Sequence, residues 1–373
     1  MSQKLNIFLS NSTDIYGGGE FYVLELAKEL QRRQHNILVG VKPDHLLREK
    51  CDQANIRTIP LDFPHQGELL KFIFKLRHVL KEHKINIIHT NSNYDRTAGA
   101  FAARLANVVH VTSVHSFHSL RHNVTHWVRN AYATNHYIVD GFCVRDLLVR
   151  EDHISTSKIS VVHLGVDPQS MKRDTVARMK IRKEFGIADD VVVIGNVGRL
   201  VPMKGQEYLL RAFALIIRQY PKARVILVGD GELQDLLLEL AQELTIQDYV
   251  TFAGFRDDLD NLYSAFDIYA HTSVEGGGET FPFAVLQALA QELPVVVTRV
   301  GDVSQMVDEG VNGFVVLEKN PNEIAEKLIL LLIDQSRRES MGVKSRQRLM
   351  DFFTLEQMVN SIEHLYFSLL NLK

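Results

Sequence analysis

Short apolar segments alternate with longer amphipathic ones along the whole chain. Residues 5–10 (LNIFLS) form an apolar run, residues 16–19 are rich in glycine, and residues 20–33 carry apolar side chains at 21, 23, 24, 27 and 30. That spacing predicts a helix with one buried face. A second apolar run follows at 35–41 (HNILVGV), and a strand–helix–strand unit of this kind predicts a parallel sheet.

The same plan starts again near residue 191. An apolar run (191–198, VVVIGNVG) precedes a loop at 199–205 and a helical segment at 206–219. The pattern predicts further strands, separated by helical stretches, at 223–231, 249–254, 267–272, 294–298 and 313–316. It therefore predicts an α/β protein with two Rossmann-like, doubly wound domains. Because such sheets bind ligands beyond the carboxyl ends of their strands, we expect the domains to face a central cleft.

The break between the two plans sets the expected domain boundaries. We predict an N-terminal domain over 1–167, a linker over 168–187 and a C-terminal domain over 188–353. The linker is expected to be solvated because it carries Lys or Arg at 172, 173, 178, 180, 182 and 183. A last helix over 354–373, where Thr354 and Gln357 have the spacing of a capping box, is expected to pack back on the N-terminal domain.

Composition and charge exclude several classes of protein. The longest purely aliphatic stretch, 328–333, is far shorter than the ~20 residues of a membrane span, and the N-terminus lacks the pattern of a signal peptide. Cys51 and Cys143 have no metal-like spacing, so we expect a cytoplasmic protein. Residues 1–167 carry 20 Lys and Arg against 16 Asp and Glu, which is too small an excess to indicate a nucleic-acid partner.

Two segments of the second half carry candidate chemistry. In the loop at 198–205, Arg199 and Lys204 lie five residues apart between a strand and a helix start, where both suit phosphate oxygens. The alternative is a pair of solvated surface cations. In the segment 273–290, Glu279 precedes a predicted helix and Gln287 lies eight positions on. Alone, these two could be a helix cap and a surface amide.

Histidines crowd the stretch 110–126, and His115 and His118 have an HxxH spacing. Metal ligation would need one consistent face and the support of carboxylates or cysteines, which the sequence does not offer clearly. We therefore expect no metal site. His115 comes directly after a predicted strand, so it is the histidine most suited to a ligand.

The segment 71–84 (KFIFKLRHVLKEHK) combines five cations with an apolar stripe. It predicts an amphipathic helix packed on the sheet with a basic outer face. The alternative is a surface that docks on anionic lipid at the inner face of a membrane.

Taken together, these motifs resemble the retaining glycosyltransferases of family 4, which have the GT-B architecture. In the second half the resemblance rests on GRLVPMKG (198–205), VGDGEL (228–233), VTFAGF (250–255), SVEGGGETFPFAVLQALA (273–290) and PVVVTRVGDVSQMV (294–307). In the first half it rests on GGGEFYVLELAKELQRR (17–33), IIHTNS (87–92), VTSVHS (111–116) and VVHLGVDP (161–168). The match covers most of the chain.

The resemblance implies a role for each matching residue. Arg199 and Lys204 would bind the diphosphate of a UDP- or GDP-sugar without a metal or other cofactor. Glu279 would match the first Glu of the family's EX7E motif, beside the donor sugar, and Gln287 would stand at the second, at the ribose. His115 would lie near the sugar. The remaining donor contacts would come from Gly18, Gly19, Gly254, Phe255, Phe281 and Phe283, with Arg256 near the base.

The resemblance also implies a glycan or lipid-linked acceptor and a place in cell-surface polysaccharide or lipopolysaccharide synthesis. Three departures from the pattern are Gln287 for Glu, Pro282 for glycine, and His163-Leu164 where Asn is usual. Two alternatives therefore stay open. One is an epimerase or phosphorylase on the same fold, and the other is a sugar-nucleotide or glycan-binding module without catalysis.

Overall fold

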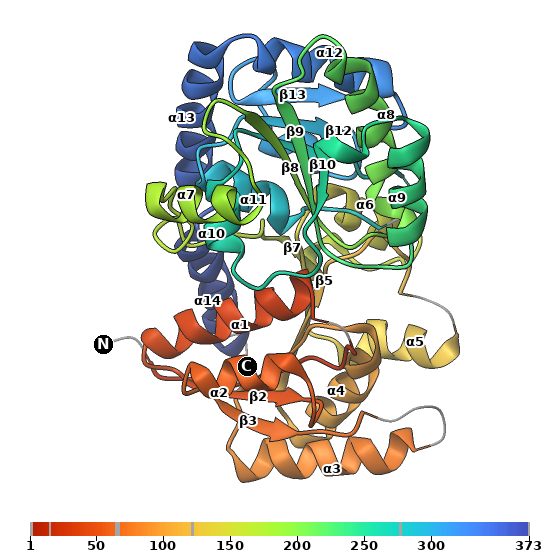
Figure 1. Cartoon of the computed structure of the whole chain (residues 1–373). Helices are drawn as coiled ribbons and strands as arrows, with labels where there is room; N and C mark the ends of the chain where they lie inside the picture. Colours follow the sequence, from red (N-terminus) through yellow and green to blue (C-terminus); the bar gives the residue numbers. More distant parts are fainter. Residues whose placement is uncertain (1–2, 15, 64–67, 121–122, 276–277, 372–373) are drawn as a thin grey trace. The chain divides into compact units, whose positions relative to one another are not determined.

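The computed structural model describes residues 3–14, 16–63, 68–120, 123–275 and 278–371 (Figure 1). The chain divides into two compact units. Unit 1 comprises residues 1–164 together with 355–373, and unit 2 comprises residues 165–354. In the described part of the chain, no helix has the length and apolar character needed to cross a membrane.

Unit 1 is built on a seven-stranded sheet in the order β3-β2-β1-β4-β5-β6-β7, and every neighbouring pair is parallel. Its strands are β1 (Asn6–Ser10), β2 (Asn36–Val41), β3 (Arg57–Pro60), β4 (Ile87–Thr90), β5 (Val109–Val114), β6 (His136–Val139) and β7 (Ile159–Val161). Its helices are α1 (Gly18–Arg32), α2 (Leu46–Gln53), α3 (Leu69–Glu82), α4 (Asn93–Ala106), α5 (Val124–Val128), α6 (Phe142–Arg150) and α14 (Leu355–Asn371).

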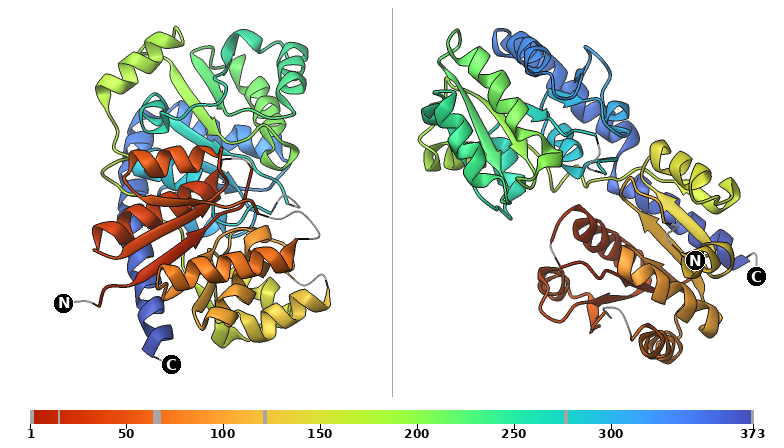
Figure 2. Two further views of the ribbon diagram at one scale, coloured as in Figure 1. Left: turned by 90° about the horizontal axis from the view of Figure 1, so that it is seen from below. Right: turned by 90° about the vertical axis from the view of Figure 1, so that its right-hand side faces the viewer.

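The helices of unit 1 cover both faces of this sheet. Helices α3 and α4 lie side by side (Figure 1), and Figure 2 shows the same unit from two further sides. They share an apolar core that includes Phe8, Leu38 and Ile88. Helix α1 contacts α2 and α14, and the right-handed rule for crossovers places α1 and α2 on the opposite face.

Helix α14, the last in the chain, belongs to unit 1. Glu363 accepts hydrogen bonds from Arg33 Nη1 at 2.8 Å and lies 2.6 Å from His35 Nε2. The Tyr366 hydroxyl lies 2.6 Å from Nδ1 of the buried His89. These contacts join the end of the chain to the start of the same unit.

Unit 2 has a six-stranded parallel sheet in the order β10-β9-β8-β11-β12-β13. Its strands are β8 (Val192–Val197), β9 (Ala223–Val228), β10 (Val250–Phe252), β11 (Ile268–His271), β12 (Val295–Thr298) and β13 (Gly313–Val316). Its helices are α7 (Thr175–Glu184), α8 (Gln206–Ile217), α9 (Gln234–Glu243), α10 (Leu259–Ser264), α11 (Phe283–Ala290), α12 (Pro321–Leu332) and α13 (Gln335–Phe352). Helices α8, α9 and α12 share one apolar core. The prediction of two Rossmann-like units is confirmed.

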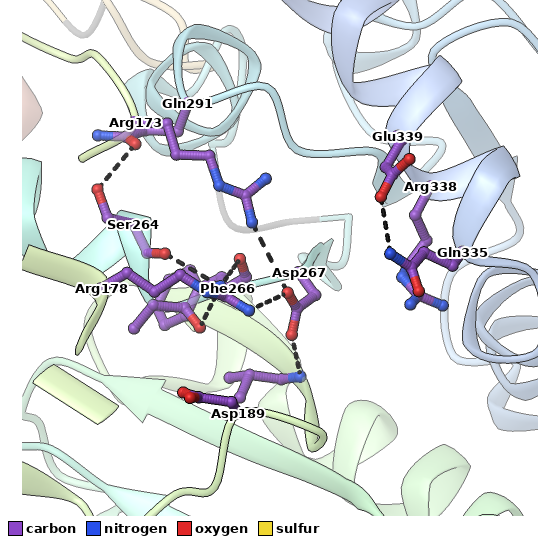
Figure 3. A network of polar contacts seen from close by, with 12 residues as sticks. Arg173, Arg178, Asp189, Ser264, Phe266, Asp267, Gln291, Gln335, Arg338 and Glu339 are labelled. Atoms are coloured by element: carbon purple, nitrogen blue, oxygen red, sulfur yellow. Dashed lines mark hydrogen bonds and ion pairs between the residues drawn. The ribbon is translucent and has the colours of Figure 1, made fainter. Parts of the chain in front are cut away.

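The segment 168–187 differs from the solvated linker that the sequence suggested. It lies in unit 2 and forms α7, which packs on α10. Figure 3 shows Arg173 and Arg178 directed at Asp267, with ion-pair distances of 3.7 and 2.7 Å. Arg182, which is 1% exposed, donates to the other carboxylate oxygen of Asp267 at 2.5 Å. The basic residues of this segment therefore converge on one acid and fix the helix to unit 2.

Candidate active site

The strand order of unit 2 reverses between β8 and β11. From β8 the chain runs outward to β9 and β10, and from β11 it runs the other way to β12 and β13. In doubly wound sheets this switch point, at the carboxyl ends of the strands, is where ligands bind. The loops that follow β8 and β11, 198–205 and 272–281, contain Arg199, Lys204 and Glu279.

The loop after β8 is held tightly against the residues after β11. Gly205 has a φ of +59°, and a Cβ atom at this position would lie 2.2 Å from the carbonyl oxygen of Thr272, so only glycine fits. The backbone N–H of Val274 donates to the Met203 carbonyl at 2.9 Å. The buried Gln206 amide donates to the Arg199 carbonyl at 3.0 Å. The backbone of this loop is therefore fixed before any ligand binds.

Lys204 and Glu279, 75 residues apart, form an ion pair in this place. Their side chains are 18% and 11% exposed. Ser273 Oγ donates to the same carboxylate oxygen, Oε2, at 2.9 Å, and His271 Nε2 lies 3.3 Å from it. No described residue donates a hydrogen bond to Oε1 of Glu279. One carboxylate oxygen is thus held by three protein groups of unit 2.

The electrostatics of this cluster favour an ionised glutamate. Burial opposes the charge on Glu279, but the nearby charge of Lys204 and the hydrogen bond of His271 outweigh it and lower the pKa of the carboxyl. Burial also lowers the pKa of His271, against the opposing effect of Glu279. A neutral His271 with its proton on Nε2 can donate to the carboxylate.

The other predicted donor residues of unit 2 lie in different settings. Arg199 is exposed in the loop after β8, and no ion pair of its guanidinium occurs within the described ranges. Gln287 lies in α11 at 6% exposure, and neither polar atom of its side-chain amide is among the buried, unpaired polar atoms of the described residues.

The aromatic and glycine residues that the resemblance suggested divide into two groups. Phe281 is buried with its ring 5.3 Å from that of Phe353, and Phe283 is buried at the start of α11. Both support the segment from inside. Gly254, with φ of +68°, and Phe255, which is 53% exposed, follow β10 at the surface. Two glycines of the segment, 276 and 277, lie outside the described residues.

Arg256 pairs with Asp258, from its Nε at 2.7 Å, and with Glu184. The hydrogen bonds to these two acids raise the pKa of Arg256. In this structure its guanidinium is thus paired with two protein carboxylates, and its place near the base stays a prediction.

Unit 1 has its own switch point, between β1 and β4. The buried Ser10 donates to Asp95 at 2.6 Å across it. Gly18 and Gly19 begin α1, the helix that follows β1 in the chain. Glu20 accepts a hydrogen bond from the Gly17 N–H at 2.7 Å. A Cβ at Gly19 would meet no atom within 4 Å, so the space above this turn is open.

His115 follows β5 in unit 1. Its ring lies 4.5 Å from that of the buried Tyr22, and its Nδ1 is 3.5 Å from Oδ2 of Asp140. The described residues contain no group of three or more His, Cys, Asp or Glu side chains that could hold a metal ion.

Three groups of these sites were not singled out from the sequence: His271 and Ser273 in unit 2 and Asp140 in unit 1. All three stand within two residues of the carboxyl end of a strand, β11 or β6. That position was a usable signal, because the ends of parallel strands line the ligand-binding edge of such sheets.

Two family models match the chain. Glycosyltransferase Family 4 matches residues 16–170 and Glycosyl transferases group 1 matches residues 177–348, so that together they take up most of the sequence. The chain is 26% identical to an uncharacterised glycosyltransferase of Methanocaldococcus jannaschii over 372 residues, with 94% of each protein covered.

Two further proteins are similar over most of their length. The Escherichia coli UDP-Gal:alpha-D-GlcNAc-diphosphoundecaprenol alpha-1,3-galactosyltransferase is 27% identical, with 80% of this chain and 79% of that protein covered. The crystal structure of Anabaena HepE in complex with UDP-glucose superposes with a TM-score of 0.85 at 23% identity, covering 98% of this chain and 100% of that one. From these matches and its two parallel-sheet units, we conclude that the chain belongs to glycosyltransferase family 4 and is a glycosyltransferase of the GT-B fold.

Proposed function

We propose that the protein transfers a sugar from a nucleoside-diphosphate sugar to a hydroxyl group of a glycan or lipid-linked acceptor, with retention of the anomeric configuration. The observation that carries this proposal is the cluster of Lys204, Glu279 and His271 at the switch point of unit 2, with Arg199 on the same loop as Lys204. The similar E. coli and Anabaena proteins, by name, use UDP-Gal and bind UDP-glucose.

In this proposal the two cations receive the donor diphosphate. Lys204 would exchange its contact with Glu279 for phosphate oxygens, and the exposed Arg199 would add a planar fork of donors. Their charges would stabilise the leaving nucleoside diphosphate, as a divalent ion does in other transferases. Glu279 would then be held by Ser273 and His271 and would present its other oxygen, Oε1, to a sugar hydroxyl.

The proposed chemical step breaks the bond between the anomeric carbon and the diphosphate oxygen and forms a bond from that carbon to the acceptor oxygen. Retention follows from attack on the face that the diphosphate leaves. The leaving phosphate oxygen takes the proton of the acceptor hydroxyl, so no separate pair of carboxylates is required.

The acceptor is the less defined substrate. The E. coli relative acts, by its name, on a sugar linked to diphosphoundecaprenol, a lipid carrier. We propose an acceptor of this kind, with a place in cell-surface polysaccharide or lipopolysaccharide synthesis. Cys51 and Cys143 are not joined in a disulfide, which suits a reaction on the cytoplasmic side of the membrane.

The test begins with a thermal-shift screen of UDP-, GDP-, ADP- and TDP-sugars, since a ligand of the native state raises its melting temperature. The sugar nucleotide that binds is then incubated with lipid-linked acceptors, with and without EDTA, and the anomeric configuration of the product is read by NMR. We expect a retained anomer and turnover that survives EDTA. An inverted product would overturn the retaining step, and loss of turnover in EDTA would overturn the metal-independent one.

A further inference from the structure

Helix α3 of unit 1 has one face committed to the core and one that is exposed. Its buried face consists of Phe72, Ile73, Leu76, Val79 and Leu80, which pack in the apolar cluster that α4 shares. This packing fixes the rotation of the helix. The residues on its opposite side therefore form one exposed face.

The outer face of α3 carries two large apolar side chains one turn apart. Leu70 is 73% exposed and Phe74 is 58% exposed. Single exposed apolar residues are ordinary in soluble proteins. Here the spacing of four residues places both on the same side of the helix, so that they form one projecting apolar ridge.

Cations border this ridge. Lys71, Lys75 and Lys81 are exposed on the same face, and the side chain of Lys71 is 85% exposed. The acids of the helix and its N-cap are Glu82 and Glu68, at its two ends, and Glu68 lies 4.0 Å from the Lys71 ammonium in an exposed ion pair. The centre of the face is therefore apolar and positively charged.

Helix α9 of unit 2 offers a contrast within the same chain. It also exposes two leucines, Leu236 at 59% and Leu238 at 39%. Their neighbours on the helix include Asp235 and Glu239, and the helix contains no Lys or Arg. Exposed leucines are thus not always paired with cations in this protein, and α3 differs by its charge.

We propose that the outer face of α3, formed by Leu70, Lys71, Phe74, Lys75 and Lys81, docks on the surface of an anionic lipid bilayer. Leu70 and Phe74 insert between the lipid headgroups and reach the acyl chains. The lysines lay their aliphatic stems along the same boundary and place their ammonium groups at lipid phosphates. An acidic protein partner would satisfy the lysines but would give no apolar phase for the projecting ridge.

This docking would hold the enzyme at the surface where a lipid-linked acceptor resides. Only this benefit for the reaction rests on the proposed function. The binding itself does not depend on the reaction. Its failure can therefore be told apart from a failure of the proposed activity.

The test is co-sedimentation of the full chain with vesicles of phosphatidylcholine alone and of phosphatidylcholine mixed with phosphatidylglycerol. We expect the protein to bind the anionic vesicles at least about tenfold more strongly than the neutral ones. The reason is that each lysine near an anionic surface strengthens binding about as much as one basic residue of a polybasic segment does. Leu70→Ser/Phe74→Ser and Lys71→Gln/Lys75→Gln/Lys81→Gln should each lower anionic binding about tenfold or more.

The matched control is Leu236→Ser/Leu238→Ser on α9, which should bind as the wild type does. Unchanged circular dichroism of the α3 variants shows that they fold. Equal binding to both kinds of vesicle, no binding by the wild type, or normal binding by the α3 variants would each overturn the proposal. A wild type that binds vesicles but shows no shift with any sugar nucleotide would leave the docking standing and refute the proposed donor site.

Discussion

Replacing Lys204 by alanine would leave the Glu279 carboxylate without its charged partner. The two side chains are 18% and 11% exposed, so the pair is largely removed from water. Breaking a buried ion pair from one side costs about 3–5 kcal/mol. Here Ser273 at 2.9 Å and His271 at 3.3 Å still hold the carboxylate, and some exposure remains. We therefore expect a loss of about 2 kcal/mol in the free energy of unfolding.

For a domain of this size, a loss of about 2 kcal/mol corresponds to a fall of roughly 4–8 °C in melting temperature. The pH dependence gives a second reading. The lowered pKa of Glu279 adds stability that is present above the ordinary carboxyl pKa of 4.5 and is lost as the pH falls through the lower folded value. Without Lys204 this pKa rises. The difference between wild type and variant should thus be largest near neutral pH and should shrink in acid.

The assay is thermal unfolding at neutral and acidic pH of the wild type, Lys204→Ala, Glu279→Gln and the double variant. If the pair is coupled as described, the double variant melts closer to the wild type than the sum of the two single losses would give. An unchanged melting temperature for Lys204→Ala, or strictly additive losses in the double variant, would refute the reasoning.

Three further predictions concern other contacts. His271→Phe should lower kcat about tenfold or more, and His271→Asn should recover part of it, because the loss is that of a hydrogen bond to the Glu279 carboxylate; equal steady-state rates in all three proteins would contradict this. Asp267→Ala leaves the buried Arg182 without its charged partner, with only backbone carbonyls to accept its hydrogen bonds, and should cost about 3 kcal/mol, measured as a lower urea midpoint. An unaltered midpoint would show that α7 is not fixed by that acid. Glu363 lies on α14 and contacts Arg33 and His35, which follow α1. Its replacement by alanine should lower the free energy of unfolding by about 1–3 kcal/mol. Hydrogen exchange in α14 should quicken, and unchanged protection would count against the contact.

Much of the fold could be predicted because strand and helix periods are local. Runs such as 35–41 and 294–298 are short, apolar and buried, as β2 and β12 are. The segment 168–187 could not be interpreted in this way. Its arginines looked like a solvated face, yet Arg178 and Arg182 converge on Asp267, 85 residues or more away in the chain. Composition does not distinguish an exposed cation from one directed at a buried acid.

The candidate site shows a similar division. Lys204 and Glu279 could each be found from their motifs, but their ion pair depends on β8 lying beside β11, a pairing of strands remote in sequence. His271 ends the buried strand β11 and was interpreted only as part of that strand. Its place at the carboxyl end of the strand was a usable signal, but the direction of its side chain, toward Glu279 and Ser273, depends on how the following loop folds.

The central claim is that Arg199 and Lys204 bind and neutralise the diphosphate of a sugar donor. The direct measurement is the acceptor-dependent release of nucleoside diphosphate by the wild type, Arg199→Ala and Lys204→Ala, with the donor found by thermal shift and each protein checked for folding by circular dichroism. The account predicts that each variant folds and loses at least about a hundredfold in turnover. Near-normal turnover in both variants would contradict it.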